Sequence, residues 1–105
     1  MRDAQIRELN DAFRTGRGDG HLVVTQGIAA RNDVWEIVQL VRKYNSFDSG
    51  NDPHGEHDFG TIEIDGQCIF WKLDLYSKDM SSGSPNPADP SVTTRILTIM
   101  LAEEY

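Results

Sequence analysis

The sequence predicts a small α+β domain in which a mainly antiparallel sheet packs against helices. Three observations predict this class: apolar residues with helical spacing near the N-terminus, a hairpin signal in the middle, and alternating helical and strand patterns between them. The predicted order of elements is α-β-α-β-β-α, with a central hairpin at about 58–65 and 67–76. A chain of 105 residues has room for a single domain, residues 1–105, because domains usually contain about 100–150 residues.

Residues 3–14 are predicted to form an amphipathic helix. Apolar residues recur there at i, i+3 and i+7, which places them on one helical face. These residues are Ile6, Leu9 and Phe13. The glycine-rich run at 16–20 is predicted to be a flexible turn that ends the helix, because glycine accepts the positive φ that follows a last turn. Residues 21–25, His-Leu-Val-Val-Thr, then predict a short strand.

A second helix is predicted to begin near Asn32 or Asp33, either of which can cap the free N–H groups of a first turn. It should fade by Tyr44. Its apolar stripe consists of Val34, Ile37, Val38 and Val41, widened by Trp35 and Leu40. Because such a stripe faces the core, Trp35 is predicted to be buried. Residues 45–55 are rich in Ser, Gly, Asn, Asp and Pro and predict a loop.

The clearest local signal is the dipeptide Asp65-Gly66, which fits a two-residue type I′ hairpin turn. The segments on either side of it then pair so that Ile62 lies opposite Ile69. One face of the hairpin becomes apolar and is predicted to face the core: Ile62, Ile64, Ile69, Trp71 and Leu73. The other face is mixed: Phe59, Thr61, Glu63, Cys68, Phe70 and Lys72.

Residues 81–90 form a connector rich in Ser, Pro, Gly and Asn. The dipeptide Asp89-Pro90 at its end predicts the start of a last helix, with Asp as the N-cap and Pro at the first helical position. The apolar stripe of this helix would be Val92, Ile96, Ile99 and Met100, with Leu97 and Leu101 beside it. We expect this helix to be largely buried.

The formal net charge is -7, and the acidic residues are concentrated in the middle of the chain. Residues 44–71 contain no Lys or Arg and six acidic residues: Asp48, Asp52, Glu56, Asp58, Glu63 and Asp65. Direct nucleic-acid binding normally requires a basic surface that neutralises phosphates, so this segment argues against it. An acidic segment suits a basic protein partner instead. The alternative interpretation is an ordinary soluble surface.

Cellular location is predicted from what the sequence contains. Cys68 is the single cysteine, which excludes an internal disulfide and fits a reducing compartment. The polar N-terminus does not resemble a secretion signal, and no apolar run approaches the roughly 20 residues that span a bilayer. The sequence therefore predicts a soluble cytoplasmic protein. Cys68 lies in a predicted strand among apolar residues and is expected to be buried and unreactive.

Residues 52–58, Asp-Pro-His-Gly-Glu-His-Asp, contain the side chains best suited to chemistry. Histidines and carboxylates bind divalent metals and also act as general acids and bases. The candidate metal ligands would be Asp52, His54, His57 and Asp58. The segment contains neither the His-Glu-x-x-His pattern nor calcium-loop spacing, and a polar loop with local hydrogen bonds explains the same residues. We therefore predict no catalytic residue, no metal and no cofactor.

Three strings in the last two-thirds of the chain carry a family resemblance. They are Asn51–Gly60, the run Ile-Phe-Trp-Lys-Leu-Asp at 69–74, and residues 84–102. Together they resemble a small bacterial family, a domain of unknown function found mainly in alphaproteobacterial genomes, phages and plasmids. The resemblance implies a stand-alone protein from mobile-element neighbourhoods and supplies no catalytic residues. By analogy with small acidic inhibitors of host defence in that setting, it implies an anti-CRISPR-type inhibitor.

The leading hypothesis from the sequence is a non-enzymatic interaction protein that inhibits a basic, nucleic-acid-handling complex by presenting carboxylates where phosphates normally bind. The predicted partner-binding residues are Asp48, Asp52, Glu56, Asp58, Glu63, Asp65, Phe59 and Phe70. Glu103 and Glu104 would form a second acidic patch. One rival hypothesis is a small metal-dependent or acid/base enzyme centred on residues 54–58. The other is a plain binding module.

Overall fold

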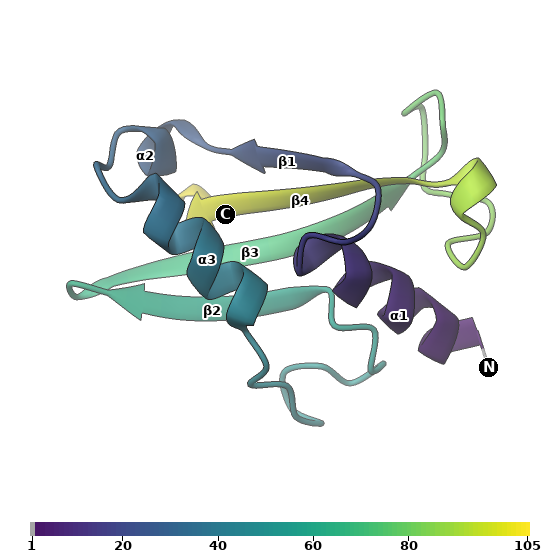
Figure 1. Ribbon diagram of the computed structural model, residues 1–105, viewed down its shortest axis with the longest axis horizontal. Helices are drawn as coiled ribbons and strands as arrows, with labels where there is room; N and C mark the ends of the chain where they lie inside the picture. The colour runs from purple at the N-terminus through teal and green to yellow at the C-terminus, as the bar shows by residue number, and fades with distance from the viewer. Residues whose placement is uncertain (1) are drawn as a thin grey trace.

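The computed structural model describes residues 2–105, which form one four-stranded sheet with two helices packed on one of its faces (Figure 1). The strand order is β1-β4-β3-β2. The elements are α1 (Arg2–Arg14), β1 (His21–Val24), α2 (Gln26–Ala29), α3 (Val34–Lys43), β2 (Phe59–Ile64), β3 (Gln67–Tyr76), η1 (Pro90–Val92), β4 (Thr94–Leu101) and η2 (Ala102–Glu104). The predicted α+β class is confirmed. None of the helices in residues 2–105 has the length and apolar character needed to cross a bilayer.

The predicted last helix is wrong, because that segment forms strand β4 in the interior of the sheet. β4 pairs antiparallel with β3 and parallel with β1. Burial alternates along the strand as far as Ile99, after which Met100 and Leu101 are both buried, and the strand is rich in the β-branched residues that favour strands. Asp89-Pro90 does start a helical turn, but this turn, η1, is only three residues long. Asp89 caps it by accepting a hydrogen bond from the Ser91 amide at 2.9 Å.

The predicted hairpin is confirmed in position and register. Ile62 lies opposite Ile69, and Gly60 lies opposite Trp71. Asp65 and Gly66 have φ values of 52° and 76°, the positive values that a type I′ turn requires. A Cβ atom at position 60 would overlap the indole of Trp71, so glycine lets the edge strand pass directly over the largest core side chain.

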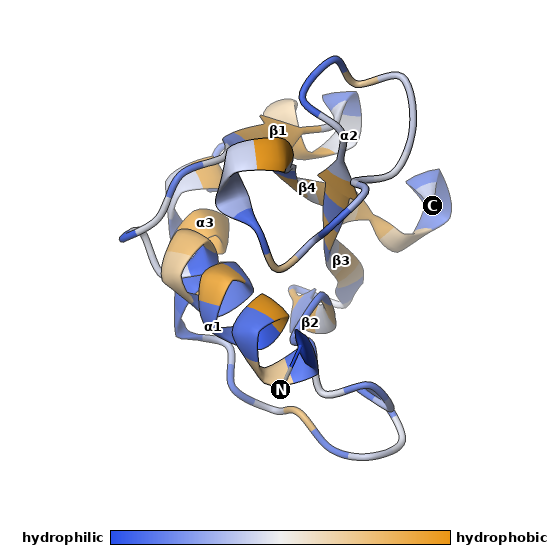
Figure 2. Cartoon of the chain, turned by 90° about the vertical axis from the view of Figure 1, so that its right-hand side faces the viewer, coloured by the Kyte–Doolittle hydropathy of each residue, from blue (hydrophilic) through white to orange (hydrophobic). Residues whose placement is uncertain are grey.

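The core lies between the sheet and helices α1 and α3 (Figure 1). Figure 2 shows hydrophobic residues on β3, β4 and parts of both helices, whereas the segment between α3 and β2 is mostly hydrophilic. Helix α3 begins after Asp33, as predicted, and buries Ile37 and Val41 completely. Trp35 is 64% exposed, contrary to prediction. Since each helical residue turns by about 100°, Trp35 lies beside the buried stripe, and its ring contacts the guanidinium of Arg42 instead, 5.6 Å from the centroid.

The opposite face of the sheet, which we call the open face, carries the outward side chains of the hairpin. Phe59 and Phe70 lie on this face, as the predicted alternation requires. Cys68 also points outward and is exposed, so the prediction of a buried thiol was wrong. Its Cα partner is Glu63 near the hairpin turn, which is also exposed.

Candidate partner-binding surface

The loop between α3 and β2 is fixed to the rest of the molecule by His57. Nδ1 of this histidine lies 2.9 Å from a carboxylate oxygen of Asp11 in α1, and Nε2 lies 3.6 Å from Oδ2 of Asp52. The ring stacks on Phe47 with a centroid distance of 3.8 Å and an interplanar angle of 3°. Asp52 also accepts a hydrogen bond from the His57 amide at 3.2 Å. These contacts hold an otherwise polar loop in one conformation.

Arg14 connects the contacts of His57 and Asp11 to the end of α3. Its Nη1 donates to the carbonyls of Val41 and Tyr44 at 2.8 and 2.9 Å, which satisfies acceptors at the end of that helix. Its Nη2 donates to Asp11 at 3.1 Å, and its guanidinium lies 5.2 Å from the ring centroid of Trp71. Arg14 is 4% exposed. Side chains of α1 and the loop are therefore joined with backbone carbonyls at the end of α3 in one largely buried cluster.

This arrangement separates the residues of the predicted His-rich site. Asp52 is only 9% exposed and faces His57, so it is an interior residue of the loop. His54 is exposed, and both ring nitrogens of His57 face carboxylates. Among residues 2–105, no group of three or more His, Cys, Asp and Glu side chains converges as metal ligands. Asp52, His54, His57 and Asp58 are thus not assembled into a metal site.

Glu56 and Asp58 form the centre of an acidic cluster. Burial is the largest cause that raises the pKa of each carboxyl above its ordinary value, and nearby carboxylates raise it further. Asp58 and Asp3 are the main acidic neighbours of Glu56, while Asp52 acts on both. His54 opposes the increase in each case. Within the described residues, neither Glu56 nor Asp58 forms an ion pair.

Asp3 belongs to this cluster although it lies about fifty residues away in the sequence. The placement of α1 beside the loop explains this proximity: Arg7 donates to the Gly55 carbonyl at 3.1 Å, and Asn10 donates to the Glu56 carbonyl at 2.9 Å. Sequence reasoning missed Asp3 because its nearness to the loop depends on tertiary packing. The position of Asp3 in the first turn of an amphipathic helix does not indicate that it lies near Glu56.

An aromatic cluster lies on the open face, consisting of Phe59, Phe70 and Tyr105. The Phe59 and Phe70 centroids are 5.2 Å apart, and the Tyr105 ring lies 6.3 Å from the first and 5.6 Å from the second. Tyr105 is 78% exposed. Phe70 lies opposite Met100 in the β3–β4 pair. Sequence reasoning missed Tyr105, because its position follows from β4, which was predicted to be a helix.

The remaining predicted acidic residues are distributed elsewhere. Glu63 and Asp65 are exposed on β2 and in the hairpin turn. Asp48 is exposed but stabilises a local turn by accepting from the amides of Gly50 and Asn51 at 2.8 and 2.9 Å. Glu104 accepts hydrogen bonds from Thr25, Gly27 and Leu101, which hold the pKa of its carboxyl below the ordinary value. The predicted acidic residues therefore do not form one continuous patch.

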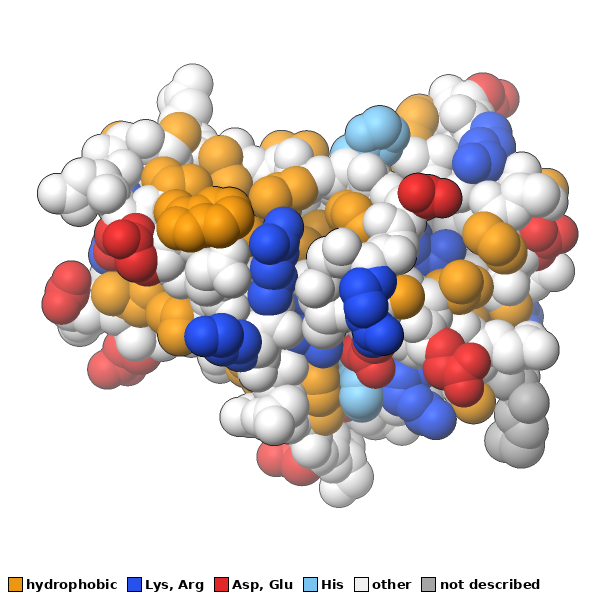
Figure 3. All heavy atoms as spheres, viewed as in Figure 1, with side chains coloured by type: hydrophobic (Ala, Val, Ile, Leu, Met, Phe, Trp, Pro, Cys, Tyr) orange, Lys and Arg blue, Asp and Glu red, His pale blue; other side chains and the backbone are white. Residues whose placement is uncertain are grey.

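The face that carries the helices has a different charge pattern. Figure 3 shows Lys and Arg side chains gathered over its middle, along α1 and the end of α3, with most acidic side chains nearer its margins. Arg42 and Lys43 are the basic residues of the last turn of α3. A basic partner is thus better matched by the acidic cluster than by the helical face.

One comparison with known proteins identifies the family of this chain. Residues 24–104 match the model of a family described as "Protein of unknown function (DUF3768)". The chain belongs to this family. No curated protein and no solved structure matches it. The matched segment contains β2, β3 and β4 but only the last residue of β1, and it includes Glu56, Asp58, Phe59 and Phe70. Asp3 and Tyr105 lie outside it.

Proposed function

We propose that this DUF3768 protein is a non-enzymatic interaction protein that binds a basic protein partner through the acidic cluster and the adjacent aromatic cluster. One observation carries the proposal: Asp58, a half-buried carboxylate without an ion-pair partner among residues 2–105, directly precedes Phe59, an aromatic residue of the open face. The start of β2 therefore joins unneutralised negative charge to exposed aromatic surface.

Each cluster supplies a different part of an interface. Aromatic residues are frequent anchors of protein interfaces, because they bury a large area with few rotatable bonds. Carboxylates next to such an anchor steer a basic partner and select its orientation. A cation from the partner would also offset the burial and the carboxylate repulsion that raise the pKa of Glu56 and of Asp58. Binding and neutralisation are then favourable together.

The partner that best fits this chemistry is a basic, nucleic-acid-handling complex in the cytoplasm. Surfaces that bind phosphates attract carboxylates by the same electrostatics, so an acidic protein on such a surface competes with nucleic acid. An inhibitor of this type, including one directed at a CRISPR effector complex, needs neither a catalytic residue nor a cofactor, and it does not bind nucleic acid itself. Glu63 and Asp65 on the same hairpin add negative charge to its surface.

The acid/base enzyme centred on residues 54–58 has less support. A general base must have a nitrogen or oxygen within reach of a substrate proton. Both nitrogens of His57 already face carboxylates, and its ring is covered on one side by Phe47.

The proposal is tested by capture of partners from host lysate with tagged protein. The key variant combines Glu56→Gln with Asp58→Asn, which removes two charges and keeps the side-chain shapes. The matched control combines Glu8→Gln with Glu36→Gln, two exposed residues of α1 and α3. Wild type and control should capture a nucleic-acid-handling complex at low salt and release it at high salt, because exposed charge pairs are screened. The key variant should lose the complex.

Equal capture of the same complex by both variants would remove the acidic cluster from the interface. Recovery of no nucleic-acid-handling complex by the wild type at either salt concentration would contradict the inhibitor proposal itself.

A further inference from the structure

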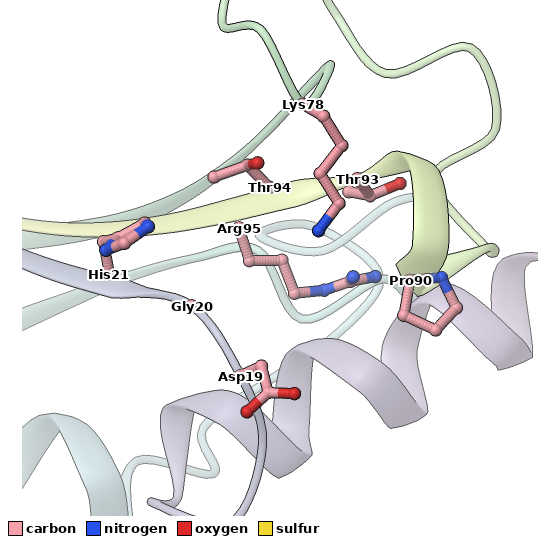
Figure 4. Close-up of a pocket in the computed structure, with 8 residues that line it drawn as sticks. All are labelled: Asp19, Gly20, His21, Lys78, Pro90, Thr93, Thr94 and Arg95. Carbon is pink, nitrogen blue, oxygen red and sulfur yellow. The ribbon is translucent and has the colours of Figure 1, made fainter.

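A second site lies at the opposite end of the β-sheet from the hairpin turn, in a cavity of about 310 Å³. The turn after α1, the start of β4 and the segment after β3 surround it (Figure 4). Its basic lining residues are His21, Lys78 and Arg95. A volume near 300 Å³ is at the lower end of the range for small-molecule sites.

Arg95 is the most unusual of these residues because it is 4% exposed. Its Nε donates to Oδ1 of Asn10 at 3.0 Å, and its Nη2 donates to the Pro87 carbonyl at 2.8 Å. Asn10 is itself fully buried and anchored to the Glu56 carbonyl. The guanidinium is therefore held in a fixed orientation by acceptors that carry no charge.

A buried guanidinium is normally neutralised by a carboxylate, since an unpaired buried charge is costly. Arg95 forms no ion pair with any residue in the part of the chain that the structure describes. Burial accordingly lowers the pKa of its guanidinium. Its Nη1 makes no hydrogen bond within residues 2–105 and is not enclosed in the protein. One face of the cation therefore remains available to the cavity.

Lys78 provides a second cation on the other side of the same cavity. Figure 4 shows its ammonium group directed toward the guanidinium of Arg95. Lys78 also forms no ion pair among the described residues. The carboxylate of Asp19 lies on the far side of the cavity and is directed away from both cations (Figure 4). Two like charges thus converge on one space, and neither forms an ion pair with another described residue.

We propose that this cavity binds the phosphate group of a small anion, with Arg95 and Lys78 as its ligands. Two cations balance the charge of a phosphate dianion. The planar fork of an arginine and the point charge of a lysine are both common phosphate ligands. The cavity is large enough for free phosphate or for a phosphate monoester with a small organic part. This site is independent of the acidic cluster and of the proposed partner.

The test is an NMR titration of the full chain with inorganic phosphate at constant ionic strength. The reporters are the amides of Gly20 and Thr94 and the Nε–H of Arg95. Substitution of Arg95 risks the fold, so the key variant is Lys78→Gln, whose side chain is exposed and makes no hydrogen bond in residues 2–105. Lys43→Gln, at the end of α3, is the matched control.

We expect saturable shifts at all three reporters in wild type and in Lys43→Gln. Binding to Lys78→Gln should be about tenfold weaker, the loss typical of one charge-assisted contact. A parallel titration with ribose 5-phosphate, using ribose as the neutral reference, distinguishes free phosphate from a phosphate monoester as the ligand. Tighter binding of the ester identifies a phosphate monoester, and equal binding identifies the free anion. The proposal would be overturned if neither phosphate nor ribose 5-phosphate produced saturable shifts. It would also be overturned if Lys78→Gln and Lys43→Gln weakened binding equally.

Discussion

The two faces of the sheet differ in how their aromatic and charged residues are used. On the helical face, Trp71 is fully buried, and Arg14 and His57 each have carboxylate partners. On and beside the open face, Tyr105 is exposed, and Asp58 has no cation within the described residues. The first face pairs its charged side chains internally, whereas the second pairs Lys72 with Asp74 at 2.8 Å but leaves Asp58 without an ion-pair partner among residues 2–105. We infer that the helical face supplies stability and that the open face supplies recognition.

The largest expected effect comes from Trp71 on the helical face. Trp71→Ala should lower the free energy of unfolding by about 3–5 kcal/mol, because it removes the largest fully buried side chain and leaves a cavity. Trp71→Phe should cost less, since a ring remains and the lost indole N–H has no acceptor in residues 2–105. Urea denaturation followed by circular dichroism measures both. A cost below about 1 kcal/mol for the alanine variant would contradict the assigned core.

Arg14 should produce the second largest effect. Arg14→Met keeps much of the apolar contact but removes the charged donor to Asp11, which keeps only His57, and to the carbonyls at the end of α3, which should cost about 2–4 kcal/mol. Hydrogen exchange should then increase in the loop at 45–58, because α1 and α3 are no longer joined there. Arg17→Met is the control, since Arg17 is exposed. Equal destabilisation by both substitutions would show that the buried cluster has no special role.

A substitution in the acidic cluster should change the free energy of unfolding less, and should raise it instead of lowering it. The folded-state pKa values of Glu56 and Asp58 are raised, so their stabilising contribution is complete below the unfolded-state pKa values and is lost as pH rises through the folded values. Glu56→Gln should therefore increase stability at pH 7, by less than about 1 kcal/mol because solvent screens the group. The difference from wild type should shrink below about pH 4. A Glu56→Gln variant that is less stable at pH 7 would contradict the cost assigned to burial of the Glu56 charge and to its repulsion by nearby carboxylates.

A small effect on stability is also expected on the open face. Phe70→Ser should change the free energy of unfolding by about 1 kcal/mol, because its ring is only partly buried. The same substitution should abolish capture of the partner. A loss of stability comparable to that of Trp71→Ala would remove the distinction between the two faces.

The sequence predicted those parts of the molecule that depend on local signals. Asp65-Gly66 defined both the turn and the register of the hairpin, and that register correctly placed Phe59 and Phe70 on the outer face. Asp89-Pro90 marked a real turn start. Local spacing misled at residues 94–101, where apolar residues fit a helical stripe and a strand equally well. The β-branched residues in that segment were the signal that favoured the strand.

The candidate sites were less predictable because they depend on tertiary packing. Asp52 has the same local sequence character as Asp48, yet it is buried because His57 folds back over it. Asp3 joins Glu56 only because α1 packs beside the loop. Arg95 resembles any other charged residue in a strand until Asn10 and Pro87 are placed around it. Long-range placement of this kind has no signature in a single sequence.

Hydrogen–deuterium exchange of the captured complex tests the central claim most directly, because it shows which face meets the partner. Binding through the open face should protect amides at 56–59 and 68–72 and leave those of α3, around exposed Trp35, unchanged. Protection concentrated on α3, with residues 56–59 and 68–72 unchanged, would contradict the assignment of recognition to the open face.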